Sequence, residues 1–364
     1  SDGSFVVVWT SNSQDGSGYG VYARHFDASG NPLTGETKVN TTTSDDQSAP
    51  VIAMDASGNF VVVWQSAKQE TGGWNTWGIF AQRFDSSCNK LGSEFQVNST
   101  VSNDQMSPSV AMDEAGNFVV VWESNNQDGD GLGIYAQRFD SLGNTILTAG
   151  ENEFLVNSTT GLNQTQPAVA MNASGAFVIA WTSQDIDSGT SDGVVARLFD
   201  SSGNTVKDEF KFHPLPANNQ HSPDVAMNDN GEFVIALVDE FWGNANVSAW
   251  LFDAAGNRQG IGAQLNQYSS GTQQNPSVAI NNAGDFIVVW ESQNQDGDGY
   301  GIVARHFNSS YSAYEDEQII NAVTVANQYA PSLAWKDNQA IIVWSGFGTE
   351  DSQGVYFRQA EINT

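Results

Sequence analysis

Two loops of the sequence carry oxygen-donating side chains at the spacing that a hard cation needs. Residues 126–131 read Asn-Gln-Asp-Gly-Asp-Gly, residues 294–299 repeat this segment, and a weaker third copy contains Asp15. Alternating oxygen donors and glycines allow a loop to wrap around calcium, and the spacing resembles the first half of an EF-hand loop. The sequence therefore predicts weak calcium binding by Asp15, Asn126, Asp128, Asp130, Asn294, Asp296 and Asp298.

The same Asp-Gly pairs also have a structural interpretation, because they favour tight hairpin turns. The bidentate acid that completes an EF-hand loop is missing, since the twelfth position counted from Asn126 is Gln137. Calcium binding and simple turn formation both remain open at this point.

Two tryptophans stand outside the repeated pattern described below. Trp74 has no counterpart at the same place in other repeats, and Trp242 lies in a diverged loop followed closely by Asn244. A tryptophan beside carboxylates and amides suits stacking against a sugar ring. We predict carbohydrate binding by Trp74, Trp242 and Asn244, with packing of each tryptophan over its own hairpin as the alternative.

Motifs of enzyme catalysis are missing from the sequence. It contains no metalloprotease histidine pair, no nucleophile elbow and no glycine loop for phosphate. Acidic residues are numerous enough to supply a glycosidase pair, but the sequence does not single one out. The sequence therefore predicts a protein that is not an enzyme.

The charge balance narrows the range of partners. Acidic residues outnumber basic ones by 42 to 13, which gives a formal net charge of −29. Such a chain repels nucleic acid and anionic membrane surfaces, so we expect neither as a partner. No apolar run is long enough to span a membrane, and the single cysteine, Cys88, excludes an intramolecular disulfide.

A repeat of 53 to 59 residues organises the chain. Its clearest mark is an apolar run that ends in tryptophan in six of seven units. The runs end at Trp9, Trp64, Trp122, Trp181, Leu237, Trp290 and Trp344. Uninterrupted apolar runs such as 118–122 indicate strands that are covered on both faces.

Each unit contains four short strand-like segments, which we call A to D in chain order. In the third unit they cover residues 108–112, 118–122, 134–139 and 153–156. Seven such units predict an all-β protein, a seven-bladed β-propeller of four-stranded antiparallel blades. We expect one domain over residues 1–364, with first and last blades that are incomplete in sequence.

Two further residue types recur once per unit, which favours structural roles. A glutamine stands three residues before a proline at the start of strand A, as in Gln105 and Pro108, and we expect it to bind loop backbone between adjacent blades. Arginines recur on strand C at Arg24, Arg83, Arg138, Arg197, Arg305 and Arg358, and we expect them to build the ring.

Segments such as Gln127–Asp140 and Ser107–Trp122 resemble repeats of large secreted bacterial surface proteins. Such repeats often accompany calcium-binding adhesin or repeat-toxin modules. The resemblance covers essentially the whole chain and implies a propeller at the cell surface or outside the cell.

The leading functional prediction is an extracellular adhesion module. It would recognise a glycan or a cell-surface or matrix component, with or without calcium, through the loops between strands B and C and between D and A. One alternative is a polysaccharide-active hydrolase or lyase that uses carboxylates around a central channel. The other is a structural scaffold that self-associates.

Overall fold

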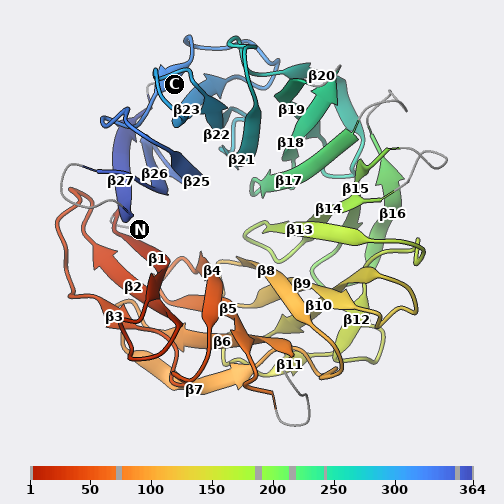
Figure 1. Cartoon of the computed structure of the whole chain (residues 1–364). Coiled ribbons are helices and arrows are strands. Elements are labelled where there is room, and N and C mark those ends of the chain that lie inside the picture. Colours follow the sequence, from red (N-terminus) through yellow and green to blue (C-terminus); the bar gives the residue numbers. More distant parts are fainter. Residues whose placement is uncertain are drawn as a thin grey trace. The chain divides into compact units, whose positions relative to one another are not determined.

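The computed structural model describes residues 3–70, 76–184, 191–212, 219–241, 244–348 and 353–362. In these residues the chain forms 27 β-strands and no helix (Figure 1). The strands fall into seven successive antiparallel sheets, which are the blades of a seven-bladed β-propeller. The predicted fold class is confirmed.

The chain divides into two compact units, Ser1–Ile179 with Phe199–Glu209, and Ala180–Leu198 with Phe210–Thr364. The first unit holds the first three sheets. Their strands are β1 (Phe5–Asn12), β2 (Tyr19–Phe26) and β3 (Thr37–Lys38), then β4 (Gln47–Met54), β5 (Phe60–Ala67), β6 (Trp77–Phe84) and β7 (Lys90–Gln96), then β8 (Gln105–Met112), β9 (Phe118–Asn125), β10 (Leu132–Phe139), β11 (Thr145–Ile146) and β12 (Glu153–Leu155).

The boundary between the units passes through the fourth sheet, and the second unit holds the last three. The fourth sheet contains β13 (Gln164–Met171), β14 (Phe177–Ser183), β15 (Gly193–Phe199) and β16 (Thr205–Lys211). The others contain β17 (Asn219–Met227), β18 (Phe233–Phe241), β19 (Asn244–Phe252) and β20 (Arg258–Gln264), then β21 (Gln273–Ile280), β22 (Phe286–Gln293), β23 (Tyr300–Phe307) and β24 (Gln318–Ile319), then β25 (Gln328–Lys336), β26 (Gln339–Gly346) and β27 (Gly354–Glu361).

Three sheets differ from the four-stranded pattern, and the first and last of them do so as their incomplete sequences predict. The first and the last sheet have three strands each, and in the third sheet the outer strand is split into β11 and β12. No helix of the described residues has the length and apolar character needed to cross a membrane.

The B strands form the core, as their apolar runs predict. Trp64, Trp122, Trp181 and Trp290 are all 0% exposed. In the first unit, Val61 and Val63 of β5 pack in one cluster with Val120 and Trp122 of β9. Each blade therefore shields its neighbour from water, which is why both faces of strand B are apolar.

Every A strand from the second sheet onward begins with an irregular residue before its proline. In the sixth sheet this residue is Asn275, whose φ of 50° lies in the left-handed region, and the strand register shifts between Gln274 and Ser277. Its counterparts are Ala49, Ser107, Gln166, Ser222 and Ala330, with φ between 51° and 55°. A bulge of this kind turns side chains and N–H groups toward new partners, and the candidate site depends on it.

The repeated glutamine binds both the loop before its strand and the tryptophan of its own sheet. Gln105 Oε1 accepts a hydrogen bond from Trp122 Nε1 at 3.2 Å, and Gln105 Nε2 donates to the Ser102 carbonyl at 3.2 Å. Ser102 lies in the loop that joins the second and third sheets, so the predicted hydrogen bond to loop backbone between adjacent blades is confirmed, and the bond to the tryptophan was not predicted. The buried indole N–H needs an acceptor, and the nearest one comes from the neighbouring strand.

Candidate functional site

The aspartates of the predicted calcium loops are bound by asparagines at the end of strand D. Asp128 Oδ2 accepts from Asn157 Nδ2 at 3.0 Å, and Asp296 Oδ2 accepts from Asn321 Nδ2 at 2.7 Å. Asp15 Oδ2 accepts from Asn40 Nδ2 in the same way, at 3.1 Å. These carboxylates hold the loop between strands B and C against the outer edge of the same blade.

The other predicted ligands also have partners in the protein. Asp130 Oδ2 accepts from the Leu162 N–H at 3.2 Å, and Asp298 Oδ2 accepts from the Ala326 N–H at 3.0 Å. The two asparagines, Asn126 and Asn294, have φ values of 57° and 60° and close their turns through their own N–H groups.

A glycine of strand C completes this arrangement. A Cβ atom on Gly133 would lie 2.6 Å from Asp128 Oδ2, and one on Gly301 would lie 2.7 Å from Asp296 Oδ2. Within the described parts of the chain, no three His, Cys, Asp or Glu side chains are grouped to hold a metal ion. Hydrogen bonding thus accounts for the Asp-Gly pattern, and calcium binding stays a prediction.

The predicted sugar-binding residues are only partly visible. Trp74 and Trp242 lie outside the described residues. Asn244 is exposed at the start of β19, where it pairs with the backbone of Phe241.

A carboxylate on an innermost strand is the feature that the sequence did not single out. Asp224 follows the proline of β17, and this position is small or apolar in the other sheets that have an A strand. Its counterparts are Val51, Ser109, Ala168, Ser277 and Ser332. In a propeller the blades surround a central channel, so this position lies on the strand of its blade nearest the channel.

Asp224 bridges two neighbouring A strands. Its Oδ2 accepts a hydrogen bond from the Val278 N–H of β21 at 2.8 Å. Burial raises the pKa of Asp224 to about 6, and hydrogen bonds from the Val278 and Val225 backbone and from Ser277 offset this only in part. The side chain is still partly exposed to solvent. A carboxyl group of this kind exchanges protons near neutral pH.

A second carboxylate, Glu291 of β22, reaches the other end of the same bulge. It accepts hydrogen bonds from Gln274 Nε2 at 2.7 Å, Asn275 Nδ2 at 2.8 Å and the Ala330 N–H at 2.7 Å. Its side chain is 2% exposed. An ionised carboxylate offers about four acceptor positions, so three donors leave one for a water molecule.

Strand β21 lies between β17 and β25 (Figure 1). Asp224 approaches it from β17 through Ser277 and Val278, whereas Glu291 links Asn275 to the Ala330 N–H of β25. The two carboxylates therefore contact β21 toward different neighbouring blades. Asp224 is partly exposed, whereas Glu291 is buried, so Asp224 is the one that a ligand can reach.

Comparison of equivalent positions in the repeats could have identified this site, although composition and motifs did not. Asp224 replaces a small or apolar residue at a repeated position, and a glutamate directly follows the tryptophan of strand B only at Glu123 and Glu291. Both stand out once the repeats are aligned on their prolines and tryptophans.

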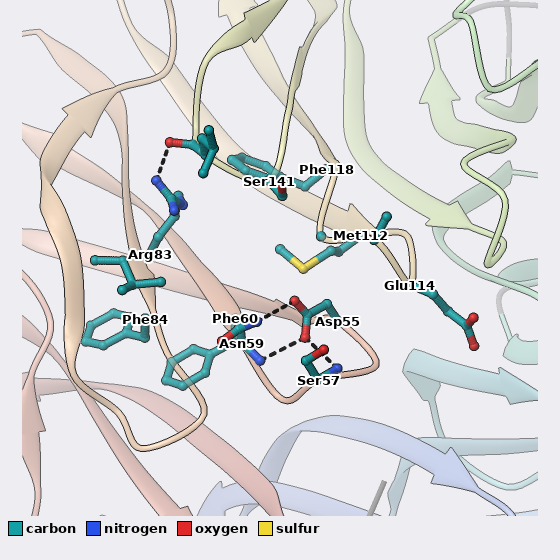
Figure 2. A pocket seen from close by; sticks show the side chains of 14 residues that line it. Asp55, Ser57, Asn59, Phe60, Arg83, Phe84, Met112, Glu114, Phe118 and Ser141 are labelled. Atoms are coloured by element: carbon teal, nitrogen blue, oxygen red, sulfur yellow. Dashed lines mark hydrogen bonds between the residues drawn. The ribbon is translucent and has the colours of Figure 1, made fainter.

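A pocket of about 380 Å³ opens between the second and third sheets of the first unit, where the A–B and C–D turns lie (Figure 2). Asp55 is bound within its own turn by Ser57 and Asn59, and the Arg83 guanidinium donates to the Leu142 carbonyl of the next blade. A similar pocket of about 260 Å³ around Arg138 follows one repeat later. Because equivalent pockets recur in successive repeats, we interpret them as a structural feature. The contacts of Arg83 with the next blade support the prediction that the arginines build the ring.

Comparison with known proteins gives the fold but no family. No protein-family model and no curated protein matches the chain. A protein of unknown function from Dyadobacter fermentans is 11% identical with a TM-score of 0.56, covering 87% of this chain and 95% of that one. The α-L-arabinofuranosidase Arb93A from Fusarium graminearum is 11% identical with a TM-score of 0.55, covering 86% and 92%.

A third similar structure is the α-L-arabinanase of Penicillium chrysogenum in complex with arabinobiose. It is 15% identical with a TM-score of 0.52, covering 86% of this chain and 93% of that one. The predictions of an adhesion module and of a protein without enzymatic activity are therefore wrong as leading interpretations, because these comparisons favour the polysaccharide-active alternative. Spaced oxygen donors and unmatched tryptophans mark loops in a sequence, whereas no local motif marks a single carboxylate on an inner strand.

Proposed function

We propose that the chain hydrolyses glycosidic bonds of a polysaccharide outside the cell, with Asp224 as its catalytic carboxyl group. The observation that carries the proposal is the carboxyl group of Asp224 on an innermost strand, whose pKa is raised to about 6 by burial. Carboxyl groups with this property act as general acids in glycoside hydrolysis.

Asp224 is the proton donor in this mechanism. Near pH 6 about half of its carboxyl groups are protonated, because its pKa is about 6. The proton passes to the glycosidic oxygen as the bond to the anomeric carbon breaks, which leaves the sugar as an oxocarbenium-like species. A water molecule then attacks the anomeric carbon and gives a proton to the Asp224 carboxylate, so the proton, the water and the displaced alcohol are all accounted for.

The Fusarium and Penicillium structures are those of enzymes that, by their names, act on arabinose-containing substrates, so arabinan is the first polysaccharide to test. Wild-type protein is expected to release reducing sugars from arabinan or from another member of a panel of neutral polysaccharides. Asp224→Ser should lower kcat by about 10² to 10⁴, because it removes the acid.

Asp224→Ser is chosen because serine occupies the same position in other repeats and keeps the bridge. Ser277 Oγ accepts from the Leu333 N–H at 3.2 Å, as Asp224 does from Val278. A folded Asp224→Ser variant with unchanged kcat would disprove the role of Asp224. A wild-type protein inert toward every polysaccharide of the panel would disprove the proposed activity.

A further inference from the structure

Six of the seven sheets share a pair of stacked phenylalanines that the last sheet lacks. One ring stands at the start of strand B and the other directly opposite it on strand C, as Phe286 and Phe307 do with ring centroids 5.1 Å apart. The other pairs, 4.6 to 5.2 Å apart, are Phe5 with Phe26, Phe60 with Phe84, Phe118 with Phe139, Phe177 with Phe199 and Phe233 with Phe252. In the seventh sheet two alanines, Ala340 and Ala360, stand opposite each other at this place.

A pocket of about 330 Å³ lies between the sixth and seventh sheets beside these two alanines. Its apolar lining residues are Ala340, Ile342 and Ala360 of the seventh sheet and Ile287, Ala304 and Ile320 of the sixth. One blade earlier, Phe286 and Phe307 pack into the apolar cluster against the fifth sheet. An apolar space that lacks such side chains binds small aromatic molecules. Ala340 is buried and Ala360 is partly exposed, so the pocket opens to solvent past Ala360.

A polar side chain in the wall of this pocket is buried and has an unpaired atom. His306 of β23 lines the pocket and is 4% exposed, and its Nε2 has no hydrogen-bond partner among the described residues. It lies on the same face of β23 as Ala304, which packs against Ile342 of the seventh sheet. Burial lowers the pKa of His306 more than the nearby Asp285 carboxylate raises it, so the imidazole is neutral at pH 7. A polar atom buried in this way is ordinarily satisfied by a partner.

The residues at the position of His306 in the second to fifth sheets have a different role. Arg83 and Arg138 donate to carbonyl oxygens of the turn between strands C and D in the next sheet. Leu198 and Leu251 have no polar side-chain atom. The unpaired imidazole nitrogen thus occurs beside the two alanines, where the phenylalanine pair is missing.

We propose that this pocket binds a small phenolic molecule, whose ring takes the place of the phenylalanine pair and whose hydroxyl pairs with His306 Nε2. A phenol hydroxyl both donates and accepts hydrogen bonds, so it satisfies a neutral imidazole in either tautomer. The aliphatic walls favour a flat aromatic ring, because burying its apolar surface is favourable. The site is independent of the proposed hydrolysis, since it lies between the last two sheets and not at Asp224 of β17.

The test is isothermal titration calorimetry of the full chain with p-cresol and with toluene, which differ only in the hydroxyl group. Saturable binding of p-cresol with one site per chain is expected, together with weaker binding of toluene. His306→Leu should weaken p-cresol binding by about three- to tenfold, which corresponds to one hydrogen bond, and should leave toluene binding within about twofold of wild type. Leucine is compatible with the fold at this position, because Leu198 and Leu251 occupy it in other sheets.

A second variant fills the pocket. The double substitution Ala340→Phe and Ala360→Phe restores the pair of the other sheets, so it should abolish p-cresol binding and raise Tm, measured by differential scanning calorimetry. Ala360→Phe alone, at the mouth of the pocket, repeats the binding test if the double variant does not fold. His25→Leu is the matched control for His306→Leu and should leave p-cresol affinity within about twofold, because Phe5 and Phe26 are present in the first sheet.

Three outcomes would overturn the proposal. One is the absence of saturable heat up to millimolar p-cresol. Another is unchanged p-cresol affinity in the folded phenylalanine variants, since the ligand would then bind elsewhere. The third is a folded His306→Leu variant that retains full p-cresol affinity or loses affinity for p-cresol and toluene equally, since the hydroxyl would then have no partner at Nε2.

Discussion

Ser109 and Asp224 occupy the same place in two repeats and make the same kind of contact. Ser109 Oγ accepts from the Val169 N–H at 3.3 Å, and Asp224 Oδ2 accepts from the Val278 N–H at 2.8 Å. A neutral hydroxyl is therefore enough to join neighbouring inner strands. The fold does not require a charged group at this position. The carboxylate of Asp224 is therefore a candidate for a functional role.

The largest expected effect is the loss of kcat in Asp224→Ser given above. Glu123 and Glu291 occupy equivalent positions and accept the Gln166 N–H and the Ala330 N–H, both at 2.7 Å. Glu123→Gln and Glu291→Gln should therefore both leave kcat within about twofold, measured by steady-state kinetics on the polysaccharide that the wild type cleaves.

Glutamine is compatible with the fold at this position. Gln65 of the second sheet accepts the Ser107 N–H at 3.0 Å through its amide oxygen. A loss of kcat in Glu291→Gln as large as that in Asp224→Ser would contradict the structural role of this position.

The next largest effect is on the free energy of unfolding. It tests the difference between Asp224 and Ser109 without any substrate. A carboxyl group whose pKa is raised by folding destabilises the native state above that pKa, here about 6. Asp224→Ser should therefore raise the free energy of unfolding by on the order of 2 kcal/mol at pH 8. The gain should be mostly lost at about pH 4, close to the pKa of an aspartate in the unfolded chain, and should vanish below it.

Urea denaturation at pH 8 and pH 4 measures this difference. Ser109→Asp is the reciprocal variant and should lose stability at pH 8. A stability change in Asp224→Ser that does not vary with pH would contradict the raised pKa.

A smaller effect of opposite sign is expected for the turn aspartates. The Asn204 side chain is the largest cause that lowers the pKa of Asp200, followed by backbone N–H groups, with burial opposing them. The stability that this charge provides is therefore present above the pKa of the unfolded chain and is lost as pH falls through the lowered folded value. Asp200→Ala should cost about 0.5 to 1.5 kcal/mol at pH 7.

Asp200→Asn separates the hydrogen bonds from the charge. Asn308 fills the equivalent turn of the sixth sheet and accepts from the Ser310 and Ser312 N–H groups at 2.9 and 3.0 Å. Asp200→Asn should retain most of the stability at pH 7 and flatten its dependence on pH in urea denaturation. A loss equal to that of Asp200→Ala would show that the charge itself matters.

The smallest expected effect is that of calcium on the repeated loops. Calcium at about five times a millimolar Kd stabilises a protein by about 1 kcal/mol. The double variant Asp130→Asn and Asp298→Asn should abolish any such increase in Tm, measured by differential scanning calorimetry. A larger increase in Tm with calcium would contradict the distinction between Asp224 and the repeated carboxylates, because the repeated carboxylates would then have a functional role as well as a structural one.

The sequence allowed the architecture to be predicted because propeller packing requires particular residue types at regular positions in each repeat. A strand covered on both faces must be apolar throughout, as residues 118–122 are, and the turns between strands need glycine and aspartate at fixed positions. The split outer strand of the third sheet was not predicted, because an insertion of four residues does not disturb the positions of its tryptophan and proline.

The sequence by itself determined seven blades and the recurrence of acids, amides and arginines. Only the tertiary structure separated the carboxylates with a structural role from those that the fold does not require. That distinction depends on contacts between segments that are distant in the sequence. Asp224 and Val278 are 54 residues apart in the chain, yet their hydrogen bond at 2.8 Å places a carboxyl group beside the bulge that Glu291 also reaches. The environment that raises the pKa of Asp224 is created by packing strands against each other, and no local pattern of residues encodes it.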